Sequence, residues 1–122
     1  MVASKIFFNN FLLKKYFIKK VFLKDIYKKK IKTYLHKQKY IKFENIKNNF
    51  LMLYNRDYPV GYILQNKNNT VGFLGTLFSM RKIGSKNFLF CNIHSWLVDT
   101  KHRIASQLLF KEILNKSVIT VL

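Results

Sequence analysis

The fold of this chain is decided by the stretch Tyr58-Pro-Val-Gly-Tyr-Ile-Leu-Gln-Asn-Lys-Asn-Asn-Thr-Val-Gly-Phe-Leu-Gly-Thr76. Apolar, aromatic and β-branched residues fill Val60 to Leu64 and again Val71 to Met80, as is typical of strands. The polar residues Asn66 to Asn69 between them have the composition of a tight turn. The stretch therefore predicts a β-hairpin.

Strand and helix patterns continue toward the C-terminus. A second turn at residues 82–86, which contains Gly84, leads to Asn87 through Asp99, whose aromatic and aliphatic content predicts a buried strand. From about His102 to Asn115 the apolar residues recur at helical spacing. The apolar run from Val118 to Leu122 predicts a last strand.

Helices are expected on the N-terminal side. We expect a strand around Tyr16–Leu23, a helix that Asp25 caps and that runs to about Lys39, and a second helix from Phe43 to Tyr54. An alternative for Phe11–Leu23 is a helix lying in a membrane surface. That alternative is disfavoured because apolar triplets recur there every five residues and would spiral around a helix instead of forming one face.

Together these elements predict an α/β (α+β) fold, a mixed sheet flanked by helices. At 122 residues the chain is one domain's worth of material. We expect a basic N-terminal extension over residues 1–15 and a domain over residues 16–122.

The formal charge of +18 favours binding to polyanions, but the residue choice offers another explanation. Lys supplies 20 of the 23 basic residues, and residues 1–57 carry a formal charge of +12. Lys, Asn, Ile, Phe and Tyr all have codons rich in A and T, so a biased genome would also give this composition. A nucleic-acid-binding module that uses the Lys-rich half therefore stays open as an alternative function.

The single Cys91 excludes an internal disulfide and favours a reducing compartment, so we expect a cytoplasmic protein. No Cys or His spacing predicts a metal site, and we expect no metal. Charged or amide side chains interrupt every apolar run well before the ~20 residues of a transmembrane helix.

Two segments carry a resemblance to a known family. The first is the hairpin stretch already quoted, in which a Val-Gly pair opens the second strand. The second is Asn92-Ile-His-Ser-Trp-Leu-Val-Asp-Thr-Lys-His-Arg103, a strand that runs through a V-D-x-x-x-R corner into a helix. In this order of elements the chain resembles the GNAT superfamily of acyl-CoA N-acyltransferases, over about half its length.

The resemblance implies that the protein transfers an acyl group from acetyl-CoA or another acyl-CoA to an amine. Free amides at a helix N-terminus bind anions, so the pyrophosphate is expected at residues 101–108, and the pantetheine arm is expected along the preceding strand edge. The implied coenzyme-binding residues are Trp96, Leu97, Val98, Arg103, Ile104, Ala105, Ser106, Gln107 and Leu108. Where the family's loop has small residues, this chain has Ser106 and Leu108, so an inactive protein with the same fold is a second alternative.

His94 is the candidate general base, since an imidazole with a pKa near ~6.5 can take a proton from an attacking ammonium. Strand alternation predicts that Asn92, His94, Trp96 and Val98 share one face. The family usually continues past the fifth strand with further elements that complete the acceptor site. We therefore expect a C-terminally incomplete GNAT domain, in which an oligomer or a partner completes the sheet.

Overall fold

A computed structural model describes residues 15–38, 57–114 and 119–121. The described elements, in chain order, are β1 (Tyr16–Val21), the 3-10 helix η1 (Leu23–Tyr27), α2 (Lys29–His36), β2 (Gly61–Asn66), β3 (Asn69–Ile83), β4 (Lys86–Val98), the 3-10 helix η2 (Thr100–Ala105), α4 (Ser106–Leu114) and β5 (Ile119–Val121).

The five strands form one sheet in the order β1-β2-β3-β4-β5. The pairs β1–β2, β2–β3 and β3–β4 are antiparallel, and β5 runs parallel to β4. A helical crossover through η2 and α4 makes the parallel pairing possible, because a parallel pair cannot be joined by a tight turn. The result is the mixed sheet flanked by helices that the sequence predicts.

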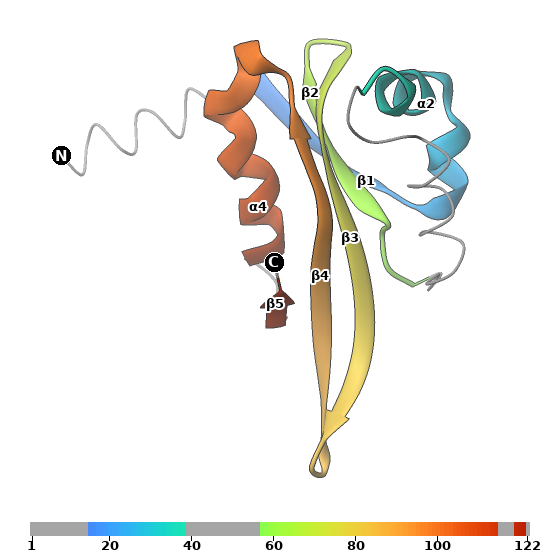
Figure 1. The fold of residues 1–122 in the computed structure, drawn as a ribbon, viewed down its shortest axis with the longest axis vertical. Coiled ribbons are helices and arrows are strands. Elements are labelled where there is room, and N and C mark those ends of the chain that lie inside the picture. The colour runs from blue at the N-terminus through green and yellow to red at the C-terminus, as the bar shows by residue number, and fades with distance from the viewer. Residues whose placement is uncertain (1–14, 39–56, 115–118, 122) are drawn as a thin grey trace, which may run out of the picture.

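Helices cover both faces of the sheet (Figure 1). On one face, α4 packs Leu108, Leu109 and Ile113 against side chains of β2 and β3 such as Leu64 and Leu74. The chain's single cysteine, Cys91, is fully buried in this cluster.

On the opposite face, α2 and η1 form a second apolar cluster with the sheet. Ile31 and Leu35 of α2 and Ile26 of η1 pack with Ile63 and Phe73. Ile31 and Leu35 are four residues apart and therefore lie on the same side of the helix, the side that faces the sheet.

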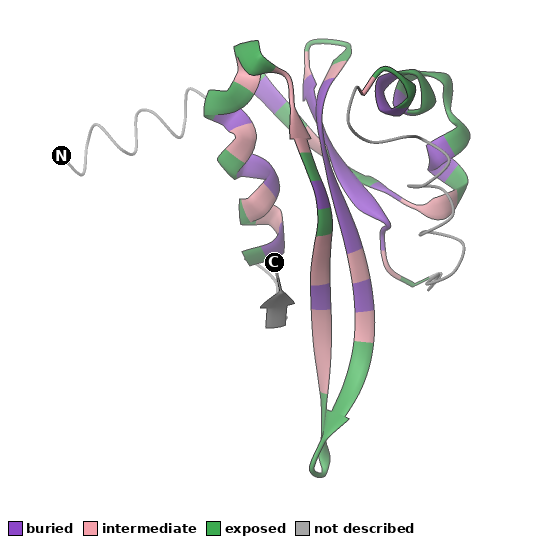
Figure 2. Ribbon diagram, in the orientation of Figure 1, coloured by how far each residue is buried: buried purple, intermediate pink, exposed green. Residues whose placement is uncertain are grey.

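The outer half of the β3–β4 hairpin extends well beyond the helices, and its end is exposed (Figures 1 and 2). Gly84 lies in its turn with a φ of +65°, a conformation that glycine adopts without the steric cost of a Cβ. Exposed Met80 and Ile83 flank Arg81 and Lys82 near this turn.

The structure confirms the predicted strands and both hairpins. It corrects the role of Asp25, which was expected to cap α2. Instead Asp25 lies in η1, where its Oδ2 accepts a hydrogen bond from the Phe22 N–H at 2.9 Å and its own N–H donates to Phe22 O at 2.8 Å. The helix predicted for residues 43–54 lies outside the described residues.

The start of the helix predicted from about His102 to Asn115 is also corrected. Residues Thr100–Ala105 form a 3-10 helix, and the α-helix begins only at Ser106. The sequence pattern did not distinguish the two, because apolar residues three apart fit both periodicities over a single turn.

Candidate functional site

A β-bulge interrupts the β3–β4 ladder near the middle of β4. Gly75 is opposite Ser95 and the next residue, Thr76, is opposite Ile93, so β4 contains one extra residue between these two pairs. That residue is His94. A bulged residue is left out of the regular ladder and changes the direction of the side chains that follow it.

The bulge overturns the predicted arrangement in which His94 and Trp96 share a face. Trp96 stacks on Phe110 of α4, with ring centroids 5.3 Å apart. The His94 ring instead packs against Gly75, which is two residues from Phe73 and so lies on the α2 face of β3. The extra residue places the two aromatic side chains on opposite faces of the sheet.

The His94 ring is close to a hydroxyl group and only partly hydrated. Its Nδ1 lies 3.0 Å from Ser95 Oγ. Packing over Gly75 removes water from part of the ring although the side chain keeps an open side, and this desolvation lowers the pKa of His94 below its ordinary value of 6.5. The imidazole is therefore neutral, and able to accept a proton, at neutral pH.

A groove of about 440 Å³ lies where β4 passes into η2 and α4. It is lined by Trp96, Val98, Arg103 and Ser106. All four belong to the set predicted to bind the coenzyme. Arg103 is exposed, and Trp96 is 43% exposed despite its stack on Phe110. The groove thus combines a cation, a hydroxyl and an aromatic face.

The other predicted coenzyme-binding residues do not line this groove. Ala105 and Leu108 are buried in the apolar cluster under α4, and Leu97 packs with the cluster on the α2 face. Ile104 and Gln107 are exposed outside the groove.

The amides of the corner are also less free than expected for residues 101–108. His102 N–H donates to Asp99 O at 2.8 Å, and the Ser106 N–H donates to Arg103 O. In a 3-10 helix each amide donates to the carbonyl three residues earlier. At the start of α4, carbonyl groups of η2 therefore already accept hydrogen bonds from amides that would otherwise be available to a ligand. The Arg103 and Ser106 side chains are the groups that the corner presents to the groove.

In the described part of the chain, one edge of β4 is open beside this groove. Among the described residues, β5 pairs only with Phe90, Cys91 and Asn92 of β4. From residue 93 onward, the outer edge of β4 has no strand partner in the part of the chain that the structure describes. Backbone N–H and C=O groups on such an edge can bind an extended ligand as an added strand would.

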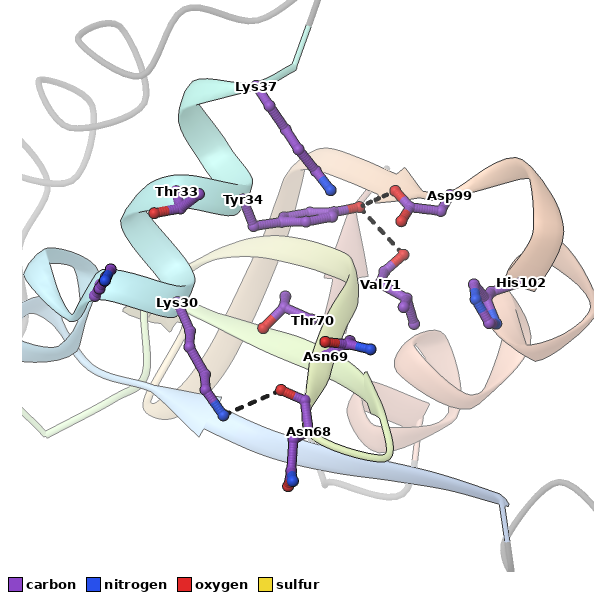
Figure 3. Close-up of a pocket in the computed structure, with 11 residues that line it drawn as sticks. Lys30, Thr33, Tyr34, Lys37, Asn68, Asn69, Thr70, Val71, Asp99 and His102 are labelled. Atoms are coloured by element: carbon purple, nitrogen blue, oxygen red, sulfur yellow. Dashed lines mark hydrogen bonds between the residues drawn. The ribbon is translucent and has the colours of Figure 1, made fainter.

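A second and larger hollow, of about 640 Å³, was not predicted from the sequence (Figure 3). We call it the lysine pocket. It lies between α2, the β2–β3 turn with the start of β3, and the corner residues Asp99 and His102. The signal that could have indicated it is the spacing of Lys30, Tyr34 and Lys37, which places all three on one side of a helix.

The described residues contain no group of three or more His, Cys, Asp or Glu that could hold a metal ion. His102, for example, lies with its Nδ1 2.8 Å from the hydroxyl of Tyr16, which ties the corner to β1. The helices in the described ranges are all too short or too polar to cross a bilayer.

Burial raises the pKa of the Cys91 thiol to about 11, so it is not a nucleophile at neutral pH.

Comparison with models of protein families finds no match, and comparison with curated protein sequences finds none either. Solved structures do match. An aminoglycoside acetyltransferase from an uncultured soil metagenomic sample superposes with a TM-score of 0.57 at 14% identity, over 91% of this chain and 78% of that one.

Two further matches come from distant organisms. An acetyltransferase of Trypanosoma brucei gives a TM-score of 0.55 at 12% identity, and glucosamine-6-phosphate N-acetyltransferase of Arabidopsis thaliana gives 0.53 at 14% identity. Each superposition covers 88% of this chain and 80% of the other. At identities this low, the superpositions establish a shared fold alone. That fold agrees with the strand order and the β4–η2–α4 corner. This chain has the fold of the GNAT acetyltransferases.

Proposed function

We propose that this protein is an acyl-CoA-dependent N-acyltransferase that moves an acetyl or other acyl group to an amine. The observation that carries the proposal is the groove of Trp96, Val98, Arg103 and Ser106 beside the open edge of β4. The fold shared with acetyltransferases supports it. The reducing cytoplasm, where acyl-CoA is available and a lone Cys91 stays reduced, is the proposed location.

The groove has the groups that an acyl-CoA needs. Arg103 supplies a fixed positive charge for the pyrophosphate, and Ser106 supplies a hydroxyl donor. The edge of β4 that no described strand covers offers main-chain donors and acceptors to the two amides of the pantetheine arm. Trp96 adds an aromatic surface over which the arm or the acyl group can pack.

In the proposed reaction the amine nitrogen attacks the thioester carbonyl, forming a C–N bond. The tetrahedral intermediate then collapses, the C–S bond breaks and coenzyme A leaves as a thiolate. A backbone N–H of β4 near the bulge is the proposed donor to the developing oxyanion. The proton lost by the amine is taken by His94, directly or through water.

The position of His94 decides from which face of the sheet the amine would have to come. It projects to the α2 face of the sheet, whereas the coenzyme groove lies on the α4 side. The amine is therefore expected to approach from the α2 side. Because desolvation lowers the His94 pKa, the imidazole is present as the free base under physiological conditions.

Titration calorimetry of the full chain with coenzyme A and acetyl-CoA tests the binding step. We expect Arg103→Glu to weaken binding by about tenfold or more, because it replaces the groove's cation with an anion. Arg81→Glu is the matched control, since it makes the same charge change on the exposed β3–β4 hairpin. Equal losses in both variants, or no binding of either ligand at millimolar concentration, would contradict the proposed coenzyme site.

Trp96 provides an independent signal, because it is the only tryptophan in the chain and lines the groove. Its fluorescence should change saturably with coenzyme A and should not change in Arg103→Glu. Release of free coenzyme thiol from acetyl-CoA in the presence of an amine panel then tests turnover. Coenzyme binding without any amine-dependent thiol release would identify a coenzyme-binding protein that lacks transferase activity.

A further inference from the structure

The lysine pocket has a strongly positive lining. Lys29, Lys30 and Lys37 contribute three positive charges and Asp99 contributes one negative charge, a formal balance of +2 without His102. A phosphate monoester carries about −1.5 to −2 at neutral pH. The charge of the pocket therefore matches that of one phosphate monoester group.

Two of the lysines are held in place by neutral partners. Lys30 Nζ donates to the backbone carbonyl of Asn68 at 3.0 Å, a bond that links α2 to the β2–β3 turn (Figure 3). An ammonium has three N–H donors, so two remain for a ligand. The Lys37 ammonium lies 4.9 Å from the centre of the Tyr34 ring, a cation–π contact that orients it without cancelling its charge.

The one carboxylate of the pocket is engaged by a neighbour. The Tyr34 hydroxyl lies 3.2 Å from both Asp99 Oδ1 and Val71 O, so its proton is directed at these two acceptors (Figure 3). Burial and the adjacent Asp99 charge raise the Tyr34 pKa, which keeps the phenol protonated as a donor. Asp99 is thus shielded by Tyr34 and opposes an incoming anion less than a free carboxylate would.

Thr70 adds an unsatisfied polar atom to the wall of the same pocket. Its Oγ1 is buried and has no hydrogen-bond partner among the described residues. A buried hydroxyl without a partner is destabilising, because it has lost its hydrogen bonds to water. As placed, the hydroxyl is shielded from the pocket, and rotation of the Thr70 side chain lets it donate to a phosphate oxygen bound there.

From these four observations we propose that the lysine pocket is a binding site for a phosphate monoester group, held by Lys30, Lys37 and the Thr70 hydroxyl. The site is separate from the groove at Arg103 and does not depend on the proposed acyl transfer. The phosphate can come from a phosphorylated small molecule, or from the 3′-phosphate of coenzyme A.

Amide NMR spectra of the full chain, titrated with inorganic phosphate against sodium chloride of equal ionic strength, test the proposal. We expect saturable shifts at residues 68–71 with phosphate and none with chloride. The double substitution K30A/K37A should weaken phosphate binding about tenfold or more. The matched control is K19A/K20A, which removes the same charge from exposed residues of β1 outside the pocket and should change affinity less than twofold.

Thr70→Val keeps the shape of the side chain and removes only the hydroxyl, so it should weaken phosphate binding severalfold. Competition experiments separate the two sources of the phosphate. If coenzyme A displaces phosphate and its 3′-dephospho form does not, the ligand of the pocket is the 3′-phosphate of the coenzyme. If neither displaces phosphate, the ligand is another phosphorylated molecule. The proposal is overturned if phosphate causes no shifts at residues 68–71. It is equally overturned if the folded K30A/K37A variant binds phosphate as tightly as the K19A/K20A control.

Discussion

The imidazole of His94 packs against the α-carbon of Gly75, where β3 and β4 change register. A methyl group added at position 75 would collide with the ring, so no larger residue fits there unless His94 moves. The glycine and the bulge together fix the position of the proposed base.

Gly75→Ala should therefore displace His94 and slow acyl transfer by about tenfold to a hundredfold, since misplacing a reacting group by an ångström has an effect of that size. Coenzyme affinity should be unchanged, because the groove lies on the other face. Steady-state rates and calorimetry on the same samples measure both effects. In a His94→Ala background the added Gly75→Ala change should cost nothing more, and a further additive loss would show that Gly75 does not act through His94.

The pH dependence of the reaction should follow the lowered pKa of His94. The rate should rise with pH as the imidazole loses its proton, with a midpoint below 6.5, and His94→Gln should remove this limb and lower the rate about 10²- to 10⁴-fold. The stability of the folded protein should also increase with pH over this range. Below pH 6.5 the unfolded chain binds a proton before the folded one does, so the free energy of unfolding falls as pH falls through the folded pKa.

His94→Gln should also flatten that part of the stability curve, which can be followed by urea unfolding at several pH values. A rate profile with its midpoint above 7 would be inconsistent with a desolvated His94 as the base.

The hydrogen bond that Asp25 accepts from the Phe22 N–H should contribute more to stability than the salt bridge between Asp25 and Lys28. Burial alone would raise the pKa of Asp25, but the hydrogen bond from the Phe22 N–H and the nearby Lys28 and Lys24 outweigh burial, so the pKa is lowered. Asp25→Ala should cost about 1–3 kcal/mol of unfolding free energy, because it leaves the Phe22 N–H without this acceptor. Lys28→Ala should cost about 0–1 kcal/mol, because the Lys28 side chain is 71% exposed.

Chemical denaturation of both variants makes this comparison. The Asp25 contribution is present above the unfolded value of 3.8 and is lost as pH falls through the lower folded pKa. Equal destabilisation by the two variants would indicate that the ion pair, and not the backbone hydrogen bond, is the important contact.

Lys67 is strained, since it has a φ of +56° in the two-residue turn between β2 and β3. Glycine is the residue preferred at the first position of a hairpin turn with positive φ. Lys67→Gly should therefore stabilise the protein by about 0.5–1 kcal/mol despite the greater flexibility of the unfolded chain. Thermal unfolding measures the gain, and Asn68→Gly, at the neighbouring position without positive φ, should give none.

The sequence predicted the hairpins well because their signals are local. The Asn66–Asn69 turn and Gly84 mark where the chain reverses, and the apolar runs on either side of each turn pair directly with each other. Of the residues that the resemblance implies for coenzyme binding, the structure brings Trp96, Val98, Arg103 and Ser106 together around one groove, and their binding of a coenzyme stays a prediction.

The bulge could not be predicted in the same way. Alternation assumes a residue-for-residue ladder, and one extra residue at His94 reverses the faces of everything after it without any change in composition. The role of Asp25 was missed for a related reason: an acid before a helix predicts a cap, but the sequence does not show that a 3-10 turn begins before Asp25. The lysine pocket depends on contacts between α2 and the β2–β3 turn, more than 30 residues apart, which no local pattern contains.

The burial of Cys91 means that a thiol-reactive reagent should leave the folded protein unmodified. Its sulfhydryl is sealed beneath α4 and stays protonated at neutral pH. In an assay of the proposed acyl transfer, a disulfide reagent added to the folded chain should react with released coenzyme thiol and not with Cys91. The colour that develops would then measure the proposed release of coenzyme A, and slow colour without acyl-CoA would report transient exposure of Cys91 as α4 separates from the sheet.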